Sequence, residues 1–246
     1  MLFMLSILAC GDKSTDTSVV EPSAEPSTEE TDTDTTEDTQ TESLSAESLS
    51  VGDIVITEIM KNPCGVTGMG PELDGNGNEY LKIDCTDPQI ADEEGEWFEV
   101  YNATGAEINL IGLMVHEVDD GDANTEEETF LVTADLLVAA GEYVVFGVSG
   151  DTSLNGGVDV DSVYDHGSFS LKNGADSIAL SNSAGILDAV SFTDEEYPDL
   201  KGHSLSLSPA TLSATDNDTG SNWCTASSAM ASGDLGTPGT ENDACQ

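Results

Sequence analysis

The segment Gly95–Asn102, with the sequence GEWFEVYN, constrains most strongly what this chain can fold into. Its side chains alternate between two faces, with Trp97 and Tyr101 on one face and Phe98 on the other. Alternation of this kind predicts a β-strand, and large apolar groups on both faces predict a further layer of protein. We therefore expect a two-layered β-domain that holds Trp97 and Trp223 in its core, rather than presenting them as platforms for carbohydrate.

Short apolar segments separated by turn signals recur along the chain and predict seven to nine strands in all. Beyond the first segment they cover residues 53–60, 108–115, 129–133, 141–148, 186–192, 203–207 and 222–224. Asn173-Gly174 favours a tight turn, so Phe169–Leu171 and Ser177–Leu180 are expected to form a hairpin across it. Thr133–Ala140 could be helical, but it is too short to change the class. The pattern predicts an all-β fold, an antiparallel β-sandwich.

Several of these segments resemble motifs of the lamin-tail domain family and follow the family's order. GEWFEVYN is similar to the family's second strand, Ile54–Met60 to its opening strand, and Gly141–Val148 to a Gly-x-Tyr-aliphatic segment. Ser204-Leu205 and the ending Gly236–Gly239 also fit. The resemblance covers about residues 53–239 and implies an immunoglobulin-like β-sandwich.

The resemblance also implies a role. Lamin-tail-like domains on exported bacterial chains often accompany enzymes such as nucleases, which implies an accessory, adhesive module that binds or gives structure. The family joins its first two strands more directly than this chain does, so residues 61–94 are interpreted as an insertion. The whole domain is predicted over residues 51–246.

The N-terminus predicts export and lipid attachment. Residues 1–9 are apolar apart from Ser6, and Ile7–Cys10 resembles a bacterial lipobox, in which the cysteine is lipidated after cleavage. Residues 1–10 are thus expected to be a lipoprotein signal peptide with Cys10 as the lipidation site; the rival interpretation is an uncleaved apolar N-terminus with a free Cys10. So few apolar residues cannot span the roughly 30 Å of hydrocarbon in a bilayer. We expect an exported protein, lipid-anchored in the bacterial cell envelope, at the outer membrane or cell surface.

Residues 11–50 have the composition of a disordered acidic tether. They include 12 acidic residues and 17 Ser or Thr, with no aromatic residue. Such a segment cannot bury enough apolar area to offset the entropy of ordering it. We expect it to hold the folded domain away from the lipid surface.

The charge of the chain excludes one class of partner. It has 49 acidic residues against five Lys and no Arg, for a net charge of −44. Binding to nucleic acid depends on Lys and Arg contacts with phosphate, so it is not expected. Apart from the membrane reached through the lipid anchor, the partners we expect are another envelope protein or a polysaccharide. The acidity itself has a plain interpretation, solubility, and a sharper one, binding of divalent cations.

Four cysteines remain once Cys10 is assigned to the anchor: Cys64, Cys85, Cys224 and Cys245. An even number in an exported chain predicts disulfides, and three pairings are open. Nearest-neighbour pairing would close two loops of similar size, each contributing roughly 3 kcal/mol. A zinc site is the rival, but the chain has no Cys-x-x-Cys and only three His.

The best candidate metal site is a loop for calcium. Oxygen-bearing side chains alternate at Asp74, Asn76 and Asn78, as in the opening half of many calcium loops, and Asp84 could complete the shell. Glu79 stands where an EF-hand needs Gly, so a solvated turn is the alternative. Residues 119–122 and 216–218 are weaker acidic candidates. No cofactor is required by this interpretation, and calcium is an optional ligand.

Signals for catalysis are weak. None of the three histidines, His116, His166 and His203, lies in a recognisable motif, and Gly-x-Ser-x-Gly is absent from the sequence. We therefore expect a non-catalytic binding or structural module and no enzyme. The alternative is a metal-dependent hydrolase built from the acidic loops around Asp74 and Asp119.

Overall fold

The chain divides into two compact units, Met1–Gln40 and Thr41–Gln246. The computed structural model describes residues 43–65, 69–73, 79–83, 85–118 and 128–245, with the backbone alone between 69 and 83. The predicted signal peptide with Cys10, and the predicted tether up to residue 42, lie outside the described residues. Within the described part, no helix is long and apolar enough to cross a membrane.

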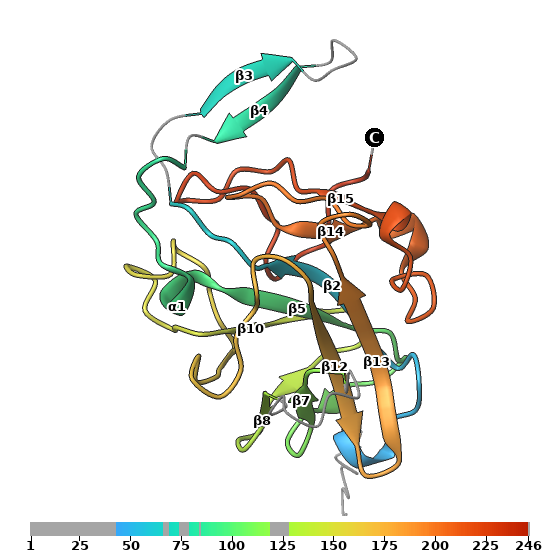
Figure 1. The fold of residues 1–246 in the computed structure, drawn as a ribbon. Coiled ribbons are helices and arrows are strands. Elements are labelled where there is room, and N and C mark those ends of the chain that lie inside the picture. The colour runs from blue at the N-terminus through green and yellow to red at the C-terminus, as the bar shows by residue number, and fades with distance from the viewer. Residues whose placement is uncertain (1–42, 66–68, 74–78, 84, 119–127, 246) are drawn as a thin grey trace, which may run out of the picture. The chain divides into compact units, whose positions relative to one another are not determined.

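Two sheets form the body of the second unit (Figure 1). The six-stranded sheet has the order β11-β10-β5-β2-β14-β15, with bounds Ser162–Val163, Tyr143–Gly147, Trp97–Asn102, Ile54–Met60, Leu205–Leu207 and Trp223–Thr225. The four-stranded sheet has the order β13-β12-β7-β8, with bounds Gly185–Phe192, Asp176–Asn182, Met114–His116 and Thr129–Leu131. Apart from the parallel pair of β10 and β11, all pairs in both sheets are antiparallel. The predicted all-β sandwich is therefore confirmed.

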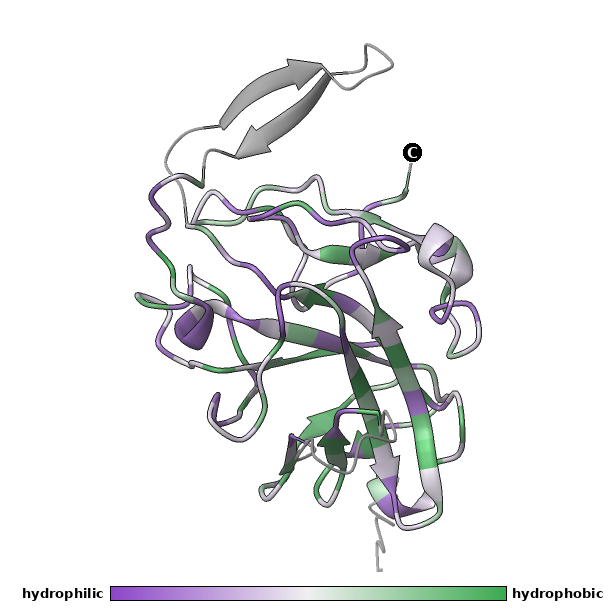
Figure 2. Ribbon diagram, in the orientation of Figure 1, coloured by the Kyte–Doolittle hydropathy of each residue, from purple (hydrophilic) through white to green (hydrophobic). Residues whose placement is uncertain are grey.

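One continuous apolar core lies between the two sheets. Ile56 and Phe98 from the six-stranded sheet share it with Ile178 from the four-stranded sheet, and all three are fully buried. Phe98 stacks on Phe146 of the neighbouring strand, with ring centroids 5.0 Å apart. Apolar residues run along β2, β5, β12 and β13 in Figure 2. The apolar residues whose alternation predicted these strands fill this core.

Both tryptophans are buried, as predicted: Trp223 in the core between the sheets and Trp97 in a smaller apolar cluster with Met60 and Val145. Trp97 is 1% exposed and Trp223 is 4% exposed, so neither offers a flat surface to a sugar. The Trp223 indole N–H donates to the Asn217 carbonyl at 2.8 Å, which satisfies its one polar group.

A small third sheet corrects two expectations. It has the order β1-β6-β9, with bounds Leu44–Ser45, Ile108–Asn109 and Leu137–Val138. The domain therefore begins before residue 51: β1 pairs with β6, and Ala46 and Leu49 are buried in the main core. Their burial explains why the end of this polar segment belongs to the domain. Thr133–Ala140 contributes the strand β9 instead of a helix.

The hairpin expected across Asn173-Gly174 does not form, because Phe169–Leu171 is not a strand. Its backbone is held by acidic side chains, as described below. The hairpin of this region is instead β12–β13, which turns at Ser183-Ala184. The segment predicted as one strand over residues 108–115 is divided into β6 and β7, and Gly112 between them has φ +88°. Few residues other than glycine adopt that φ.

The insertion between the first two long strands carries a two-stranded hairpin, β3 (Met69–Leu73) and β4 (Glu79–Ile83). It ends in a one-turn helix, α1 (Asp92–Gly95), before β5. Three single 3₁₀ turns, Ala46–Ser48, Pro209–Thr211 and Gly220–Asn222, complete the described elements.

Candidate functional site

Two glutamates lie side by side at the centre of the six-stranded sheet. Glu58 of β2 is paired in register with Glu99 of β5, next to a β-bulge in β2. Both are fully buried, although carboxylates are rarely buried without a partner. We call Glu58 and Glu99 the glutamate pair.

The glutamate pair holds the C-terminal segment of the domain. Glu58 accepts hydrogen bonds from the Ser204 hydroxyl and from the Thr237 N–H at 2.9 Å, and its Oε2 lies 3.0 Å from the Thr237 hydroxyl oxygen. Glu99 accepts from the Gly239 N–H at 2.7 Å and from the Thr57 hydroxyl at 2.7 Å. We call residues 236–242 the C-terminal clasp. The carboxyl oxygens of the pair thus accept backbone hydrogen bonds that a neighbouring strand would otherwise accept from this segment.

Burial sets the electrostatics of the pair. It raises the pKa of Glu58 to about 7, against hydrogen bonds from Ser204 and Thr237 that favour the ionised form. Burial and, to a smaller extent, the neighbouring charge of Glu58 raise the pKa of Glu99 to about 9. Two carboxylates this close cannot both ionise cheaply, so the pair retains at least one proton at neutral pH.

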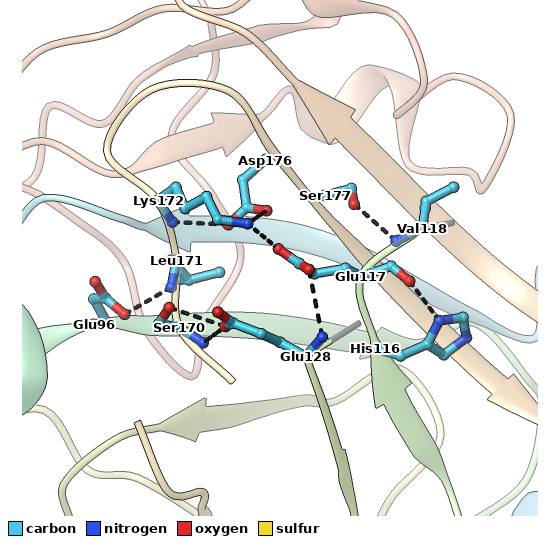
Figure 3. A network of polar contacts seen from close by, with 10 residues as sticks. All are labelled: Glu96, His116, Glu117, Val118, Glu128, Ser170, Leu171, Lys172, Asp176 and Ser177. Atoms are coloured by element: carbon cyan, nitrogen blue, oxygen red, sulfur yellow. Dashed lines mark hydrogen bonds and ion pairs between the residues drawn. The ribbon is translucent and has the colours of Figure 1, made fainter. Parts of the chain in front are cut away.

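A second group of carboxyls, shown in Figure 3, lies where β5, β7 and β8 meet the start of β12. We call its members, listed here, the acidic cluster: Glu96, Glu117, Glu128 and Asp176. Glu96 accepts from the Leu171 N–H at 2.8 Å, and Glu128 accepts from the Ser170 N–H at 2.7 Å. These bonds draw residues 170 and 171 toward the cluster, which explains why they do not pair as a strand.

One cation neutralises part of the acidic cluster. Lys172 donates to Glu117, and although burial opposes it, this bond lowers the pKa of Glu117. Asp176 shares a side-chain hydrogen bond with Glu117, and burial raises the pKa of Asp176 to about 6. Burial also raises the pKa of Glu96 to about 8, against its hydrogen bond from Leu171. The cluster thus combines an ion pair with one carboxyl, Glu96, that keeps its proton at neutral pH.

The predicted disulfides form in the nearest-neighbour pattern. Cys64 pairs with Cys85, and Cys224 pairs with Cys245, each over a sequence separation of 21 residues. Asp234 adds a link between the two regions, because its carboxylate accepts from the Cys64 and Gly65 N–H groups at 2.9 Å. The first disulfide fastens the base of the insertion, and the second fastens the end of the chain to β15.

The predicted calcium ligands, Asp74, Asn76, Asn78 and Asp84, lie outside the described residues, as does the candidate at 119–122. In the third candidate, Asn217 is fully buried and its amide donates to the Ile56 carbonyl and to Asp188, so it is engaged by the fold. Among the residues with described side chains, no three His, Cys, Asp or Glu gather in a way that could hold a metal ion.

The histidines are bound into the structure in different ways. His116 lies 3.1 Å from the Ser181 hydroxyl and 2.7 Å from the Glu117 carbonyl, the spacing of a serine–histidine pair. Ser181 is only 7% exposed, and neither residue lines the two cavities described next. The contact joins β7 to β12. His166 lies 3.6 Å from Glu96, and His203 lies 3.3 Å from the Ala226 carbonyl.

Two cavities open on the surface, away from the buried carboxyls. One, of about 340 Å³, is lined by residues that include Ile90, Glu94, Leu154 and Gly156. The other, of about 200 Å³, lies between residues 130–136 and residues 161–163. Neither of these two cavities is lined by the glutamate pair or by the acidic cluster, the groups that contain the carboxyls with raised pKa. Their chemistry is to bind backbone N–H groups.

Comparison with known proteins gives one strong match. Residues 47–194, more than half of the chain, match the family model described as Lamin Tail Domain. No curated protein matches. Among solved structures, a DUF4876 family protein from Bacteroides thetaiotaomicron is similar at 11% identity, with a TM-score of 0.36. The similarity covers 65% of this chain and 63% of that one.

Proposed function

The chain belongs to the lamin tail domain family, and on that premise we propose that it is a non-catalytic lipoprotein of the bacterial cell envelope whose domain binds a partner or gives structure. The family is one of immunoglobulin-like domains. The partners proposed are another envelope protein or a polysaccharide, and attachment to the membrane is through lipid on Cys10.

The observation that supports a non-catalytic role is the hydrogen bonding of the buried carboxyls. A catalytic acid or base must reach a substrate, and carboxyls with raised pKa in a cleft are the usual candidates. Here Glu58, Glu96 and Glu99 are at most 2% exposed and accept hydrogen bonds from the chain's own backbone. Groups engaged in this way hold the fold.

Export is supported by the two disulfides, which are typical of proteins outside the reducing cytosol. The surface also suits an aqueous envelope compartment, since the net charge of −44 keeps the protein soluble and repels anionic lipid head groups. Lipid on Cys10 would then supply the membrane attachment that the surface does not.

The anchor is tested by growing cells that express the full chain with a labelled fatty acid. The wild type is expected to carry the label and to enter the membrane fraction, whereas Cys10→Ser is expected to lose both. An unlabelled wild-type protein would contradict the anchor and leave the domain's role untouched.

The binding role is tested with the purified domain against envelope polysaccharides and a panel of hydrolase substrates, with and without calcium. We expect saturable binding to an envelope component, no turnover, and at most a calcium-dependent rise in melting temperature. Metal-dependent turnover that is lost in Asp74→Ala, or turnover that is lost in Ser181→Ala, would overturn the non-catalytic role and favour a hydrolase.

A further inference from the structure

The C-terminal clasp contains a hydroxyl group with too few hydrogens for its contacts. Thr237 Oγ1 lies 3.0 Å from Glu58 Oε2 and also 3.0 Å from Asn242 Oδ1. A hydroxyl donates one hydrogen bond and can accept others. If Glu58 and Asn242 both present acceptors, one of these two contacts has no hydrogen. Which of the two contacts contains the hydrogen depends on the orientation of Asn242 and on the protonation of Glu58.

The orientation of Asn242 is fixed by two other contacts. Its amide nitrogen lies 2.7 Å from the Thr57 carbonyl and 2.9 Å from the Leu207 carbonyl, and both contacts are buried. Each carbonyl needs a donor, so both amide hydrogens are used there. Asn242 Oδ1 can then only accept, and Thr237 must give its single hydrogen to Asn242.

Thr237 is left as an acceptor toward Glu58, and an acceptor needs a donor. We propose that Glu58 folds as a neutral carboxylic acid, and that the proton on its Oε2 locks the C-terminal clasp. A chain of donors then runs from Glu58 through Thr237 to Asn242. Loss of that proton would set two oxygens with lone pairs against each other in a buried site, which opens the clasp.

The surroundings of Glu58 favour the neutral form. Glu99 from β5 lies beside it, and the negative charge of Asp243, just beyond the clasp, opposes ionisation of Glu58. Glu99 in turn lies near Tyr143 of β10, which also feels Glu241. The groups that act on the pair are thus acidic or phenolic. The pKa of Glu58, raised to about 7 by burial, agrees with the hydrogen count.

The C-terminal clasp should open when Glu58 loses its proton at higher pH. Below pH 7 Glu58 keeps its proton and the clasp is closed; as pH rises through the pKa of about 7, the closed form is lost. The glutamate itself can be titrated in the wild-type protein by following its side-chain carboxyl carbon by NMR. We expect a midpoint more than one unit above the unperturbed value of about 4.3.

The opening of the clasp is measured by hydrogen exchange of the Thr237 and Gly239 N–H groups, corrected for the intrinsic effect of pH. In the wild type we expect protection to fall at least about tenfold between pH 6 and pH 9. Glu58→Gln places an amide N–H where the acid proton lies, so its clasp should stay protected at both values. Glu96→Gln, a buried glutamate outside the clasp, should behave like the wild type.

Two results would overturn the proposal. The first is a Glu58 midpoint near the unperturbed value, which would mean that Glu58 is ionised and that the Thr237 hydrogen is shared. The second is protection in the wild type that does not change with pH. Because the titration uses the unaltered chain, it decides the question even if Glu58→Gln fails to fold.

Discussion

The glutamate pair and the acidic cluster neutralise the charge of their buried carboxyls in different ways. Both bury carboxyls in order to hold backbone N–H groups of segments that are not strands. Among the described side chains, no Lys acts on the glutamate pair, which is neutralised by protons, whereas the acidic cluster has Lys172 bound to Glu117. A chain with 49 acidic residues and five Lys cannot pair every buried carboxylate with a cation. The comparison suggests that this domain uses protons where cations are lacking.

The largest effect expected is that of pH on the whole domain. An unfolded Glu has a pKa of 4.5, and burial raises the folded values to about 7 for Glu58, 8 for Glu96 and 9 for Glu99. Groups raised in this way give stability that is complete below pH 4.5 and is lost as pH rises through the folded values. One unit corresponds to about 1.4 kcal/mol, so the three groups together should lose on the order of 10 kcal/mol from pH 5 to pH 9.

Urea unfolding at a series of pH values measures this loss. Stability that is constant or rises between pH 5 and pH 9 would contradict the claim that protons neutralise these carboxyls. It would mean that both regions hold ionised carboxylates without cost.

Removing one member of the glutamate pair should have the next largest effect. Glu99→Ala removes the acceptor of the partly buried Gly239 N–H bond and of the buried Thr57 hydroxyl, and leaves a cavity. We expect a loss of about 3 kcal/mol in the free energy of unfolding. Glu99→Gln keeps an acceptor and the volume, and should cost less than half as much. Equal losses for the two variants would show that the carboxyl oxygens are not what matters.

The cation of the acidic cluster should matter less. Lys172 is half exposed, so solvent weakens its ion pair with Glu117, and Lys172→Gln should cost about 1 kcal/mol at pH 7. The Glu117 pKa is lowered, so this contribution exists above its unfolded value of 4.5 and is lost as pH falls through the folded value. The difference from wild type should shrink as pH falls below 4.5. The matched control is the exposed Lys201→Gln, which should have little effect at pH 7 or below pH 4.5.

The smallest effect is expected at a third buried carboxyl, Asp188 of β13. Its Oδ2 accepts from the Ile56 N–H and the Asn217 amide, while Asp188 Oδ1 and Asn217 Oδ1 are buried without a hydrogen-bond partner. Burial raises the pKa of Asp188 to about 6. Asp188→Asn keeps the acceptor and supplies a donor, so stability should stay within about 1 kcal/mol of wild type at pH 5 and improve at pH 8. A loss above 2 kcal/mol in thermal or urea unfolding would show that the ionised form is needed.

Most of the fold could be predicted from the sequence because local patterns of apolar and polar residues mark the strands. Alternation over GEWFEVYN predicted β5, and the cysteine count led to the two disulfides. The failed prediction at Phe169–Leu171 has a non-local cause: the segment has the pattern of a strand, but Glu96 and Glu128 bind its backbone from far along the chain. Local propensity cannot register such contacts.

The glutamate pair was also missed, although a signal was present. Glu58 and Glu99 each stand inside a strongly apolar strand, where a charged residue needs a buried partner. The partner segment follows about 140 to 180 residues later, at Thr237 and Gly239. The ending Gly236–Gly239 was noticed only as a resemblance to the family, and its physical role required the structure.

Proton release on unfolding tests the central claim most directly. At pH 7, where the unfolded chain ionises its glutamates, the folded domain should retain protons on Glu96 and Glu99 and on a share of Glu58. Unfolding in unbuffered urea under a pH-stat should therefore release about two protons per molecule. Release of none, or uptake of protons, would contradict the account.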